Sequence, residues 1–355
     1  MEVRHLINIE DVSVSWWEDL YRQCCEIIAR PSGFSLSCSG KVMASLFFEP
    51  STRTNFSFQA AMMRLGGSVF GFSEPGATST AKGETLADTV RMMSSYSDTI
   101  VIRSPFEGAA MASSLFSDVP IINAGDGGHF HPTQTLADLT TISQKRGGIG
   151  NLNIGICGDL LNGRTVHSLV SALSKFPNIH FFLISPRELS IPDYMLGHLK
   201  QQNQKYIEIT SLESTLPQLD VLYMTRIQRE RFADPKDYER LKNSYILNKR
   251  KLQMAKKDCL VMHPLPRLDE IARDVDDDPR AVYFEQARYG MFIRMALLLK
   301  TTHYERIAAQ PIRASTKLQC RNPKCITHTE TYLPALTKDA DKESCAYCDK
   351  KMLTI

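Results

Sequence analysis

Short apolar runs alternate with amphipathic stretches along most of this chain. In its first part, the runs predict buried strands at residues 42–48, 68–71, 99–103 and 119–123. The stretches between them predict helices at 52–65 and 84–96, and a third helix begins near Pro132, a residue that suits a first helical turn. The helix at 52–65 has apolar residues in most directions around its axis, so we expect it to be buried. These residues are Phe56, Phe58, Ala60, Met63 and Leu65.

A glycine-rich break at residues 147–150 precedes a second alternation. This part predicts a helix at 165–176 and a long apolar helix from about Arg288 to Leu299. Its strands are predicted at 154–157, 180–184, 206–209, 221–224, 260–262 and 282–284. Repeated strand–helix alternation is typical of parallel sheets covered on both faces. The sequence therefore predicts an α/β protein with two doubly wound parallel-sheet domains.

The segment after about residue 307 is polar, carries cysteines, and is too short to enclose an apolar core alone. Its four cysteines are spaced as Cys320-x4-Cys325-x19-Cys345-x2-Cys348. Two close pairs of this kind are typical of a structural Zn²⁺ site with four thiolate ligands and no open position for catalysis. His328 is a weaker candidate ligand. We therefore predict a small zinc-binding domain at residues 310–355.

Composition indicates a soluble globular protein. A hydrophobic content of 43% and a charged content of 23% are typical of soluble globular proteins. No apolar run is long enough to span a bilayer, and the first ten residues lack the apolar core of a secretory signal, so we expect a cytoplasmic protein. A disulfide framework is not expected there. Cys157 and Cys259 lie in apolar, strand-like runs and are predicted to be small core residues.

The charge balance argues against a nucleic-acid partner. The formal net charge is +3, and nine Lys/Arg against six Asp/Glu lie after residue 300. The first 300 residues are therefore neutral, with 33 groups of each sign. A nucleic-acid surface normally shows a basic stripe, and we find none in this part of the sequence.

A first group of polar residues, Glu49-Pro50-Ser51-Thr52-Arg53-Thr54, lies between a predicted strand and helix. A helix start exposes unpaired N–H groups and the positive end of the helix dipole, which attract phosphate. The hydroxyls add donors, and the Arg53 guanidinium suits phosphate oxygens. The alternative is an ordinary Ser/Thr helix cap beside a surface arginine.

Further polar groups follow other predicted strands. His131-Pro132-Thr133-Gln134 stands at a helix start, where open α/β sheets bind ligands, and its His131 and Gln134 share a helical face. A capping or core histidine is the alternative. Arg164 and Arg226 also follow predicted strands and can together grip two carboxylates of a small dianion, although an isolated arginine is usually a solvated surface charge. His263-Pro264-Leu265-Pro266-Arg267 follows another.

Residues 1–301 resemble the aspartate carbamoyltransferase family. The motifs that carry the resemblance occur in the family's order: Phe47-Phe48-Glu49-Pro50-Ser51-Thr52-Arg53-Thr54, Lys82-Gly83-Glu84-Thr85-Leu86-Ala87-Asp88-Thr89, Asn123-Ala124-Gly125-Asp126-Gly127, His131-Pro132-Thr133-Gln134-Thr135-Leu136, Gly158-Asp159, Gly163-Arg164-Thr165-Val166-His167-Ser168, Tyr223-Met224-Thr225-Arg226 and His263-Pro264-Leu265-Pro266-Arg267. The segment from Cys320 to His328 is similar to the zinc domain of the same enzyme's regulatory chain. The resemblance implies transfer of the carbamoyl group of carbamoyl phosphate to L-aspartate, in pyrimidine (UMP) synthesis.

The resemblance also implies roles for individual residues. Phosphate would be held by Ser51, Thr52, Arg53 and Thr54, and the carbamoyl carbonyl or its neighbours would be contacted by Arg103, His131 and Gln134, with Arg53 and Thr54 assisting. The aspartate carboxylates would bind Arg164, Arg226 and Gln228, and the backbone at Pro264 and Leu265 would accept hydrogen bonds from nitrogen groups. Ser79 and Lys82 would reach the site from a neighbouring subunit, in a segment one residue shorter than in the well-known bacterial form.

The resemblance further implies a homotrimer with shared active sites, with any higher assembly left open. Residues 1–140, completed by a helix at about 288–309, would bind carbamoyl phosphate, and residues 141–287 would bind aspartate. Catalysis would need no metal or covalent intermediate. His131 would help electrostatically, and the departing phosphate would take the proton. Because no nucleotide-binding regulatory domain fits in the chain, we expect no nucleotide signal.

Two rival functions were weighed against this one. Carbamoyltransferases that use ornithine typically have Cys where this chain has Pro264 and present acidic groups to a cationic substrate, whereas the paired arginines here favour an anionic acceptor. A zinc-ribbon nucleic-acid binder on an inactive scaffold conflicts with the neutral body of the chain.

Overall fold

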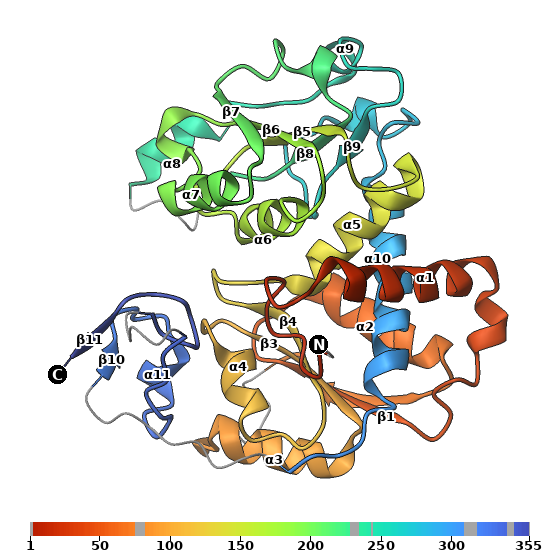
Figure 1. Cartoon of the computed structure of the whole chain (residues 1–355), viewed down its shortest axis with the longest axis vertical. Coiled ribbons are helices and arrows are strands. Elements are labelled where there is room, and N and C mark those ends of the chain that lie inside the picture. The colour runs from red at the N-terminus through yellow and green to blue at the C-terminus, as the bar shows by residue number, and fades with distance from the viewer. Residues whose placement is uncertain are drawn as a thin grey trace. The chain divides into compact units, whose positions relative to one another are not determined.

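The computed structural model describes residues 3–74, 82–227, 234–242, 244–308, 318–338 and 344–354 (Figure 1). It divides into two compact units. The first unit comprises Met1–Thr133 with Met291–Ile355, and the second comprises Gln134–Gly290. The functional names given above to parts of the chain remain predictions.

The first unit is built on a parallel sheet with the strand order β2-β1-β3-β4. Its strands are β1 (Val42–Phe47), β2 (Ser68–Phe72), β3 (Thr99–Ser104) and β4 (Ile121–Asp126). β2 pairs with one edge of β1, and β3 and then β4 follow on the other edge of β1. The strand order therefore reverses between β1 and β3, which pair directly through Phe47 and Arg103.

Outside the tail, four α-helices among the described residues belong to the first unit, and two further helices cross its boundary with the second. The four are α1 (Val14–Ala29), α2 (Thr52–Arg64), α3 (Leu86–Tyr96) and α4 (Ala109–Ser114). The two that cross are α5 (Pro132–Arg146) and α10 (Tyr283–Thr301). The predicted burial of α2 on all sides is wrong: Phe56 and Met63 are 61% and 58% exposed. They lie seven residues apart on one face, while Phe58 and Met62 on another face are fully buried.

The second unit holds a five-stranded parallel sheet with the order β7-β6-β5-β8-β9. Its strands are β5 (Leu152–Cys157), β6 (Ile179–Ile184), β7 (Lys205–Ile209), β8 (Val221–Met224) and β9 (Leu260–Met262). Its helices are α6 (Arg164–Leu173), α7 (Asp193–Gln201), α8 (Pro235–Leu241) and α9 (Lys249–Leu252). Here the order reverses between β5 and β8.

One predicted strand of the second part is wrong. Residues 282–284 continue into helix α10, which begins at Tyr283 and not near Arg288. A bridge from Val261 to Ala281 and a bond from the Val282 N–H to the Val261 carbonyl at 3.0 Å lie just before the helix starts. A short apolar run fits a buried strand or a buried helix turn equally well, and helix formation prevails here. Cys157 and Cys259 are fully buried, as predicted.

The cysteine-bearing tail forms a small module with β10 (Leu318–Cys320), β11 (Met352–Thr354) and α11 (Ile326–Thr329). We call its described residues, 318–338 and 344–354, the tail module. β10 and β11 pair antiparallel, and the module lies beside α3 and α4 of the first unit (Figure 1). Its buried residues Ile326, Leu333 and Tyr347 belong to the same apolar cluster as residues of α3, α4 and the first sheet. A tail too short to build a core alone therefore shares one.

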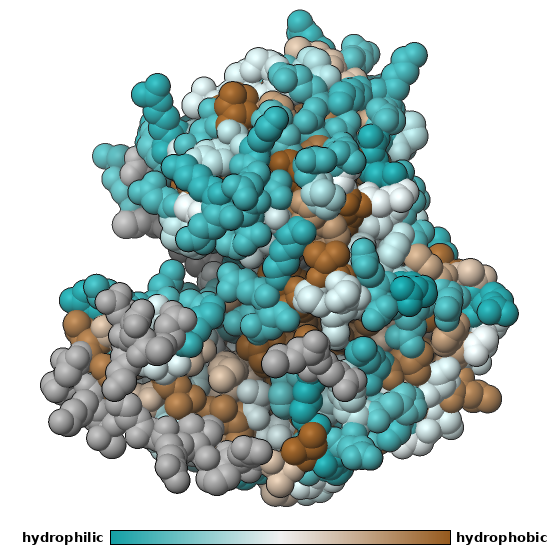
Figure 2. All heavy atoms as spheres, in the orientation of Figure 1, coloured by the Kyte–Doolittle hydropathy of each residue, from teal (hydrophilic) through white to brown (hydrophobic). Residues whose placement is uncertain are grey.

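The structure confirms the predicted architecture of two parallel α/β domains and a small C-terminal module. On the face of the second unit shown in Figure 2, hydrophilic residues predominate and hydrophobic ones are scattered. Among the described residues, none of the helices combines the length and apolar character needed to cross a membrane.

Candidate active site and metal centre

The start of α2 lies at the carboxyl end of β1, beside the point where the first sheet reverses its strand order. Ser51 occupies the N-cap position, but its side chain makes no capping hydrogen bond. The ordinary-cap interpretation of this serine is therefore not supported, and its hydroxyl is left for another partner. Arg53 is exposed in the first turn, and burial of its surroundings lowers the pKa of its guanidinium. Helix N–H groups, a hydroxyl and a cation thus gather where a phosphate can bind.

Buried polar contacts hold this helix start in place. Asn55 is 5% exposed, and its Oδ1 accepts hydrogen bonds from Ser45 Oγ at 2.8 Å and Gln59 Nε2 at 2.8 Å. Because Ser45 lies in β1, the first bond ties helix to strand. On α10, Arg294 donates to Ser57 Oγ at 2.8 Å and stacks over the ring of Phe58 at 5.1 Å. The first turn of α2 is therefore fixed from two sides.

Arg103 is the second-last residue of β3, the strand next to β1, and is 8% exposed. Its guanidinium pairs with Glu49 Oε2 at 3.1 Å and donates to the carbonyl of Ala124 at 3.2 Å. The following strand, β4, leads through a turn to His131, which is 5% exposed and has Thr133 Oγ1 at 3.5 Å from its Nδ1. The segment 51–54, Arg103 and His131 thus lie at or just beyond the carboxyl ends of three neighbouring strands, at one edge of the sheet.

Three of the predicted site residues lie on or beside parts of the chain that are not described. Lys82 is exposed at the start of a described segment. Ser79 and Gln228 lie outside the described residues.

In the second unit, Arg164 and Arg226 stand at the carboxyl ends of β5 and β8, the two strands between which the order reverses. Arg164 is the first residue of α6, and Gly163 caps this helix. A Cβ at Gly163 would approach the carbonyl oxygen of Asp159 to 2.6 Å, so only glycine fits this tight turn. Open α/β sheets bind ligands at such reversal points, and two arginines there suit a dicarboxylate.

The loop after β9 carries Pro264 and Leu265 and is held by a buried hydrogen bond. His263 Nε2 lies 2.8 Å from Glu270 Oε1, and both side chains are less than a tenth exposed. Burial alone would raise the pKa of Glu270, but the hydrogen bond from His263 holds it below its usual value. The His263 Nδ1 atom accepts from the backbone N–H of Leu265 at 2.8 Å. The loop backbone is therefore rigidly oriented at the same sheet edge as Arg164 and Arg226.

A buried network around Asp138, which sequence reasoning missed, links these parts of the second unit. This fully buried carboxylate accepts from Gln134 at 2.8 Å, Gln286 at 2.6 Å and Tyr223 at 3.0 Å. Gln286 in turn accepts from the backbone N–H of His263 at 3.0 Å. Burial and the nearby carboxylate raise the pKa of Tyr223. The network fixes the orientation of the Gln134 amide. The only local signal for this network was the spacing of Gln134 and Asp138, which lie one helical turn apart.

The four cysteines of the tail module form one cluster. Their Sγ atoms all lie within 4.8 Å of one another, and the residues are buried. Thiolates around one tetrahedral Zn²⁺ ion at about 2.3 Å would be roughly 3.8 Å apart, so the cluster fits four-sulfur ligation. The backbone N–H of Asn322 and the hydroxyl of Thr327 donate to two of the sulfurs, at 3.4 and 3.3 Å. Such donors stabilise thiolates.

His328 is not part of the cluster. Its Nε2 lies 2.8 Å from the backbone carbonyl oxygen of Cys320, which gives the ring a structural hydrogen bond instead. The four cysteines are therefore the candidate metal ligands, and His328 is not.

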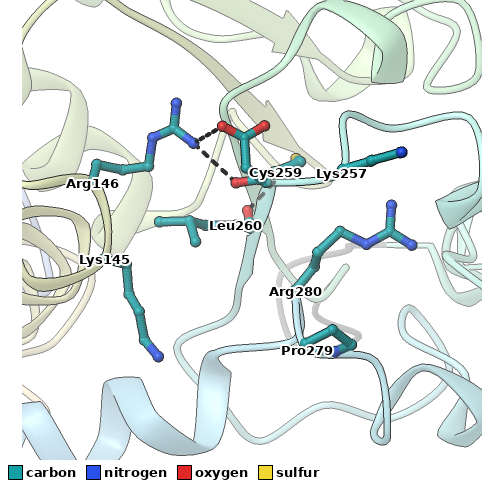
Figure 3. Close-up of a pocket in the computed structure, with 8 residues that line it drawn as sticks. Lys145, Arg146, Lys257, Cys259, Leu260, Pro279 and Arg280 are labelled. Atoms are coloured by element: carbon teal, nitrogen blue, oxygen red, sulfur yellow. Dashed lines mark hydrogen bonds and ion pairs between the residues drawn. The ribbon is translucent and has the colours of Figure 1, made fainter.

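A pocket of about 490 Å³ in the second unit lies at a different place from the predicted site (Figure 3). Its lining includes Lys145, Arg146 and Arg280 and the amino end of β9. Ligands of open α/β sheets bind at carboxyl strand ends, the opposite edge. Arg146 also pairs with Asp258 at 2.7 Å, and Arg280 pairs with Asp278 at 2.8 Å. These cations are already neutralised, so we assign no substrate to this pocket.

Comparisons with known proteins divide the chain in three. Residues 4–144 match the aspartate/ornithine carbamoyltransferase carbamoyl-P binding domain, and residues 150–301 match the Asp/Orn binding domain of the same family. Residues 313–354 match the metal binding domain of the aspartate carbamoyltransferase regulatory chain.

Individual relatives agree with this division. The aspartate carbamoyltransferase catalytic subunit of Clostridium kluyveri is 54% identical over 84% of this chain and 97% of its own length. That of Clostridium botulinum strain Eklund 17B is 55% identical over the same shares. The two substrate-binding regions thus align with nearly complete catalytic subunits, and the tail lies beyond the alignment.

Solved structures show the same likeness. The catalytic subunit of M. jannaschii aspartate transcarbamoylase is 46% identical, with a TM-score of 0.79 over 84% of this chain and 98% of that one. Aspartate transcarbamoylase from Trypanosoma cruzi, in complex with N-(phosphonacetyl)-L-aspartic acid, is 39% identical with the same TM-score, over 84% and 95% of the two chains. The chain belongs to the aspartate/ornithine carbamoyltransferase family and carries a regulatory-chain metal binding domain at its carboxyl end.

Proposed function

We propose that this protein is an aspartate carbamoyltransferase. It transfers the carbamoyl group of carbamoyl phosphate to L-aspartate and yields N-carbamoyl-L-aspartate and phosphate, in the synthesis of UMP. The observation that carries the proposal is the chemistry at the two strand-order reversals. One presents an uncapped helix start and a cation suited to phosphate, and the other presents two arginines suited to a dicarboxylate. The names of the relatives agree with it.

Carbamoyl phosphate binds through the first unit. The helix N–H groups and the side chains of Ser51, Thr52, Arg53 and Thr54 hold its phosphate. Arg103 and His131 face the carbamoyl end, and Gln134 hydrogen-bonds its amide with an orientation fixed by Asp138. In this proposal, Lys82 and Ser79 of a neighbouring copy complete the anion site in a homotrimer.

Aspartate binds through the second unit. Arg164, Arg226 and Gln228 hold its two carboxylates, since forked guanidinium donors match carboxylate oxygens. The backbone carbonyls at Pro264 and Leu265 accept hydrogen bonds from the nitrogen groups of the reacting molecules. The His263–Glu270 pair keeps those carbonyls in one orientation. A cationic acceptor such as ornithine would meet the wrong sign of charge.

The chemical step forms a C–N bond and breaks a C–O bond. The neutral amine of aspartate attacks the carbamoyl carbon, and negative charge grows on the carbonyl oxygen. Fixed donors stabilise this charge: Arg53, Thr54, Arg103 and His131. Phosphate then leaves with the bonding electron pair and takes the amine proton. Positioning and electrostatics supply most of the acceleration.

The tail module binds one structural Zn²⁺ ion through Cys320, Cys325, Cys345 and Cys348. The ion supplies no chemistry to the reaction, because four sulfur ligands leave no open coordination position. Its contribution is to fold the module, as metal does in small domains without a core of their own.

Two measurements test the function. Purified protein is assayed for carbamoylation of aspartate and of ornithine in parallel, and we expect product from aspartate only. Binding of N-(phosphonacetyl)-L-aspartate is measured by calorimetry, and one equivalent per chain is expected. Product from ornithine alone, or no binding of this bisubstrate analogue, would refute the proposal. Native mass with zinc content tests the homotrimer and the metal.

A further inference from the structure

The tail module contacts several segments of the first unit, and three of these contacts adjoin proposed site residues. The first contact is at Glu107, just after β3. Its backbone N–H donates to the carbonyl of Lys324 at 2.9 Å, and its carbonyl accepts from Ile326 N–H at 2.9 Å. The Glu107 carboxylate, which is buried, accepts from Asn322 Nδ2 at 2.7 Å. Glu107 thus both donates a backbone hydrogen bond to the module and accepts one from it.

The second contact is at His129, in the loop between β4 and α5. Its Nε2 lies 3.0 Å from Asp349 Oδ2 of the module, and its Nδ1 lies 3.1 Å from Asp126 Oδ2. The His129 side chain is 9% exposed and that of Asp126 is 2% exposed. Asp126 also accepts from the backbone N–H groups of Phe130 at 2.9 Å and Gly108 at 2.8 Å. One buried imidazole therefore bridges the module and the carboxylate that organises the loop.

The third contact is at the start of α3. Glu330 accepts a hydrogen bond from the backbone N–H of Leu86 at 3.1 Å, and the hydroxyl of Tyr332 accepts from Ala87 N–H at 2.9 Å. These N–H groups have no partner within their own helix, because they lie in its first turn. The module thereby provides acceptors for the first N–H groups of α3, a helix that begins shortly after Lys82.

Each of these three segments adjoins a residue of the proposed carbamoyl phosphate site. The loop of Glu107 follows Arg103, the loop of His129 precedes His131 by two residues, and the start of α3 follows Lys82. The two loops are also joined to each other, since Gly127 N–H donates to the carbonyl of Ser104 at 2.8 Å. A module with a purely stabilising role need not touch all of these segments.

We propose that His129 is a positioning residue, which through its bond to Asp349 makes the tail module a structural part of the carbamoyl phosphate site. The inference rests on the proposed function and deepens it. His129 itself does not touch substrate. It fixes the loop that carries His131, and a loop held by the buried Asp126 and the partly exposed Asp349 presents the ring in one orientation. Misplacing such a group by about 1 Å can cost roughly a hundredfold in rate.

The charges around His129 support a lasting bond between His129 and Asp349. Burial alone would lower the pKa of His129, but Asp126 and Asp349 raise it to about 10. Lys338 pairs with Asp349 at 3.2 Å and with Glu10 at 3.1 Å, and the Phe130 ring lies 4.0 Å from the imidazole. The imidazolium therefore stays charged at physiological pH, and both of its N–H groups donate.

The test compares His129→Ala and Asp349→Asn with Glu10→Gln. The last variant breaks another contact between module and body, the Glu10–Lys338 pair, away from the loop of His131. The KM for carbamoyl phosphate is measured with the active sites counted by titration with N-(phosphonacetyl)-L-aspartate. Inorganic phosphate affinity is measured by calorimetry, and zinc content by metal analysis.

We expect His129→Ala and Asp349→Asn to raise the KM for carbamoyl phosphate and to weaken phosphate binding by about tenfold. The KM for aspartate and the zinc content should stay within about twofold. A purely structural role would lower the number of active sites and leave the KM unchanged, which would overturn the proposal. An equal rise in KM in Glu10→Gln would overturn it as well.

The double variant His129→Ala/Asp349→Asn provides an independent check. If both residues act through one bond, the double variant should bind phosphate no more weakly than His129→Ala alone. Additive losses would contradict the proposed link. An inactive wild-type protein would refute the aspartate carbamoyltransferase function itself, and that outcome is distinct from an active wild type whose variants keep a normal KM.

Discussion

Gly108 is a point where the tail module packs tightly against the body of the first unit. It precedes α4 with a φ of 85° and ψ of 4°. A Cβ added there would lie 2.5 Å from the carbonyl oxygen and 2.5 Å from the Cβ of Tyr347, a residue that is 1% exposed. Atoms this close cannot be accommodated without displacing the backbone of the module. We therefore expect Gly108→Ala to loosen the docked module.

Gly40 offers a matched control. It also has a positive φ, 75°, but no atom lies within 4 Å of the position of an added Cβ. Alanine in the left-handed region costs roughly 1–2 kcal/mol at either site. Only Gly108→Ala adds the crowding against Tyr347, and overpacking of this kind costs about 1–3 kcal/mol. The difference between the two variants isolates the contact with the module.

Hydrogen exchange measures this difference. The amide of Ile326 is bonded to the Glu107 carbonyl at 2.9 Å and is protected while the module is docked. A cost of about 1–3 kcal/mol corresponds to exchange that is roughly 5 to 150 times faster in Gly108→Ala than in Gly40→Ala. Equal exchange rates at this amide in the two variants would show that the close packing against Tyr347 does not hold the module.

Three further outcomes are expected. Arg53→Ala should lower kcat roughly a thousandfold, while Arg64→Ala at the far end of the same helix stays near wild type; comparable kcat values in steady-state assays would refute the role of Arg53. Cys345→Ser should abolish stoichiometric zinc binding in metal analysis, and full retention of the ion would contradict the ligand assignment. Burial and the nearby Arg4 lower the pKa of His5 to about 4 in the folded protein, and its Nδ1 accepts from Ile121 N–H. Protonation therefore favours the unfolded chain, and the wild type should lose up to about 3 kcal/mol of stability as pH falls from 6.5 to 4. His5→Asn keeps an acceptor that does not titrate, so its urea-unfolding stability should fall less over this range; parallel losses would disprove the role of His5.

Much of the fold was predictable because most strands of the two sheets are buried and bounded by turns. The run that forms β8 is buried at every position, and its apolar character is continuous. The errors arose where the residue types of a segment do not show which way its side chains point or which element it forms. Phe56 and Met63 share an exposed face of α2, which a count of apolar residues does not reveal. The run at 282–284 was too short to distinguish a strand from the first turn of α10.

The site was predictable where polar residues follow strands and less so where partners are distant in sequence. The segment 51–54 and Arg103 stand at strand ends, and that position is visible in the sequence. The Asp138 network joins residues from 134 to 286, and no local pattern predicts such contacts. The bond between His129 and Asp349 spans 220 residues and was likewise invisible before the fold was known.

The order of the two units along the chain has a consequence for biosynthesis. The second unit is one uninterrupted segment, Gln134–Gly290, whereas the first is assembled from both ends of the polypeptide. Domains generally fold as they emerge from the ribosome, so the second unit can complete itself while the first still lacks the later part of α10 and the four cysteines of the tail module. The apolar surfaces of α3 and α4 that the module covers therefore stay open until translation is nearly finished. A nascent chain released just before Cys320 would expose them.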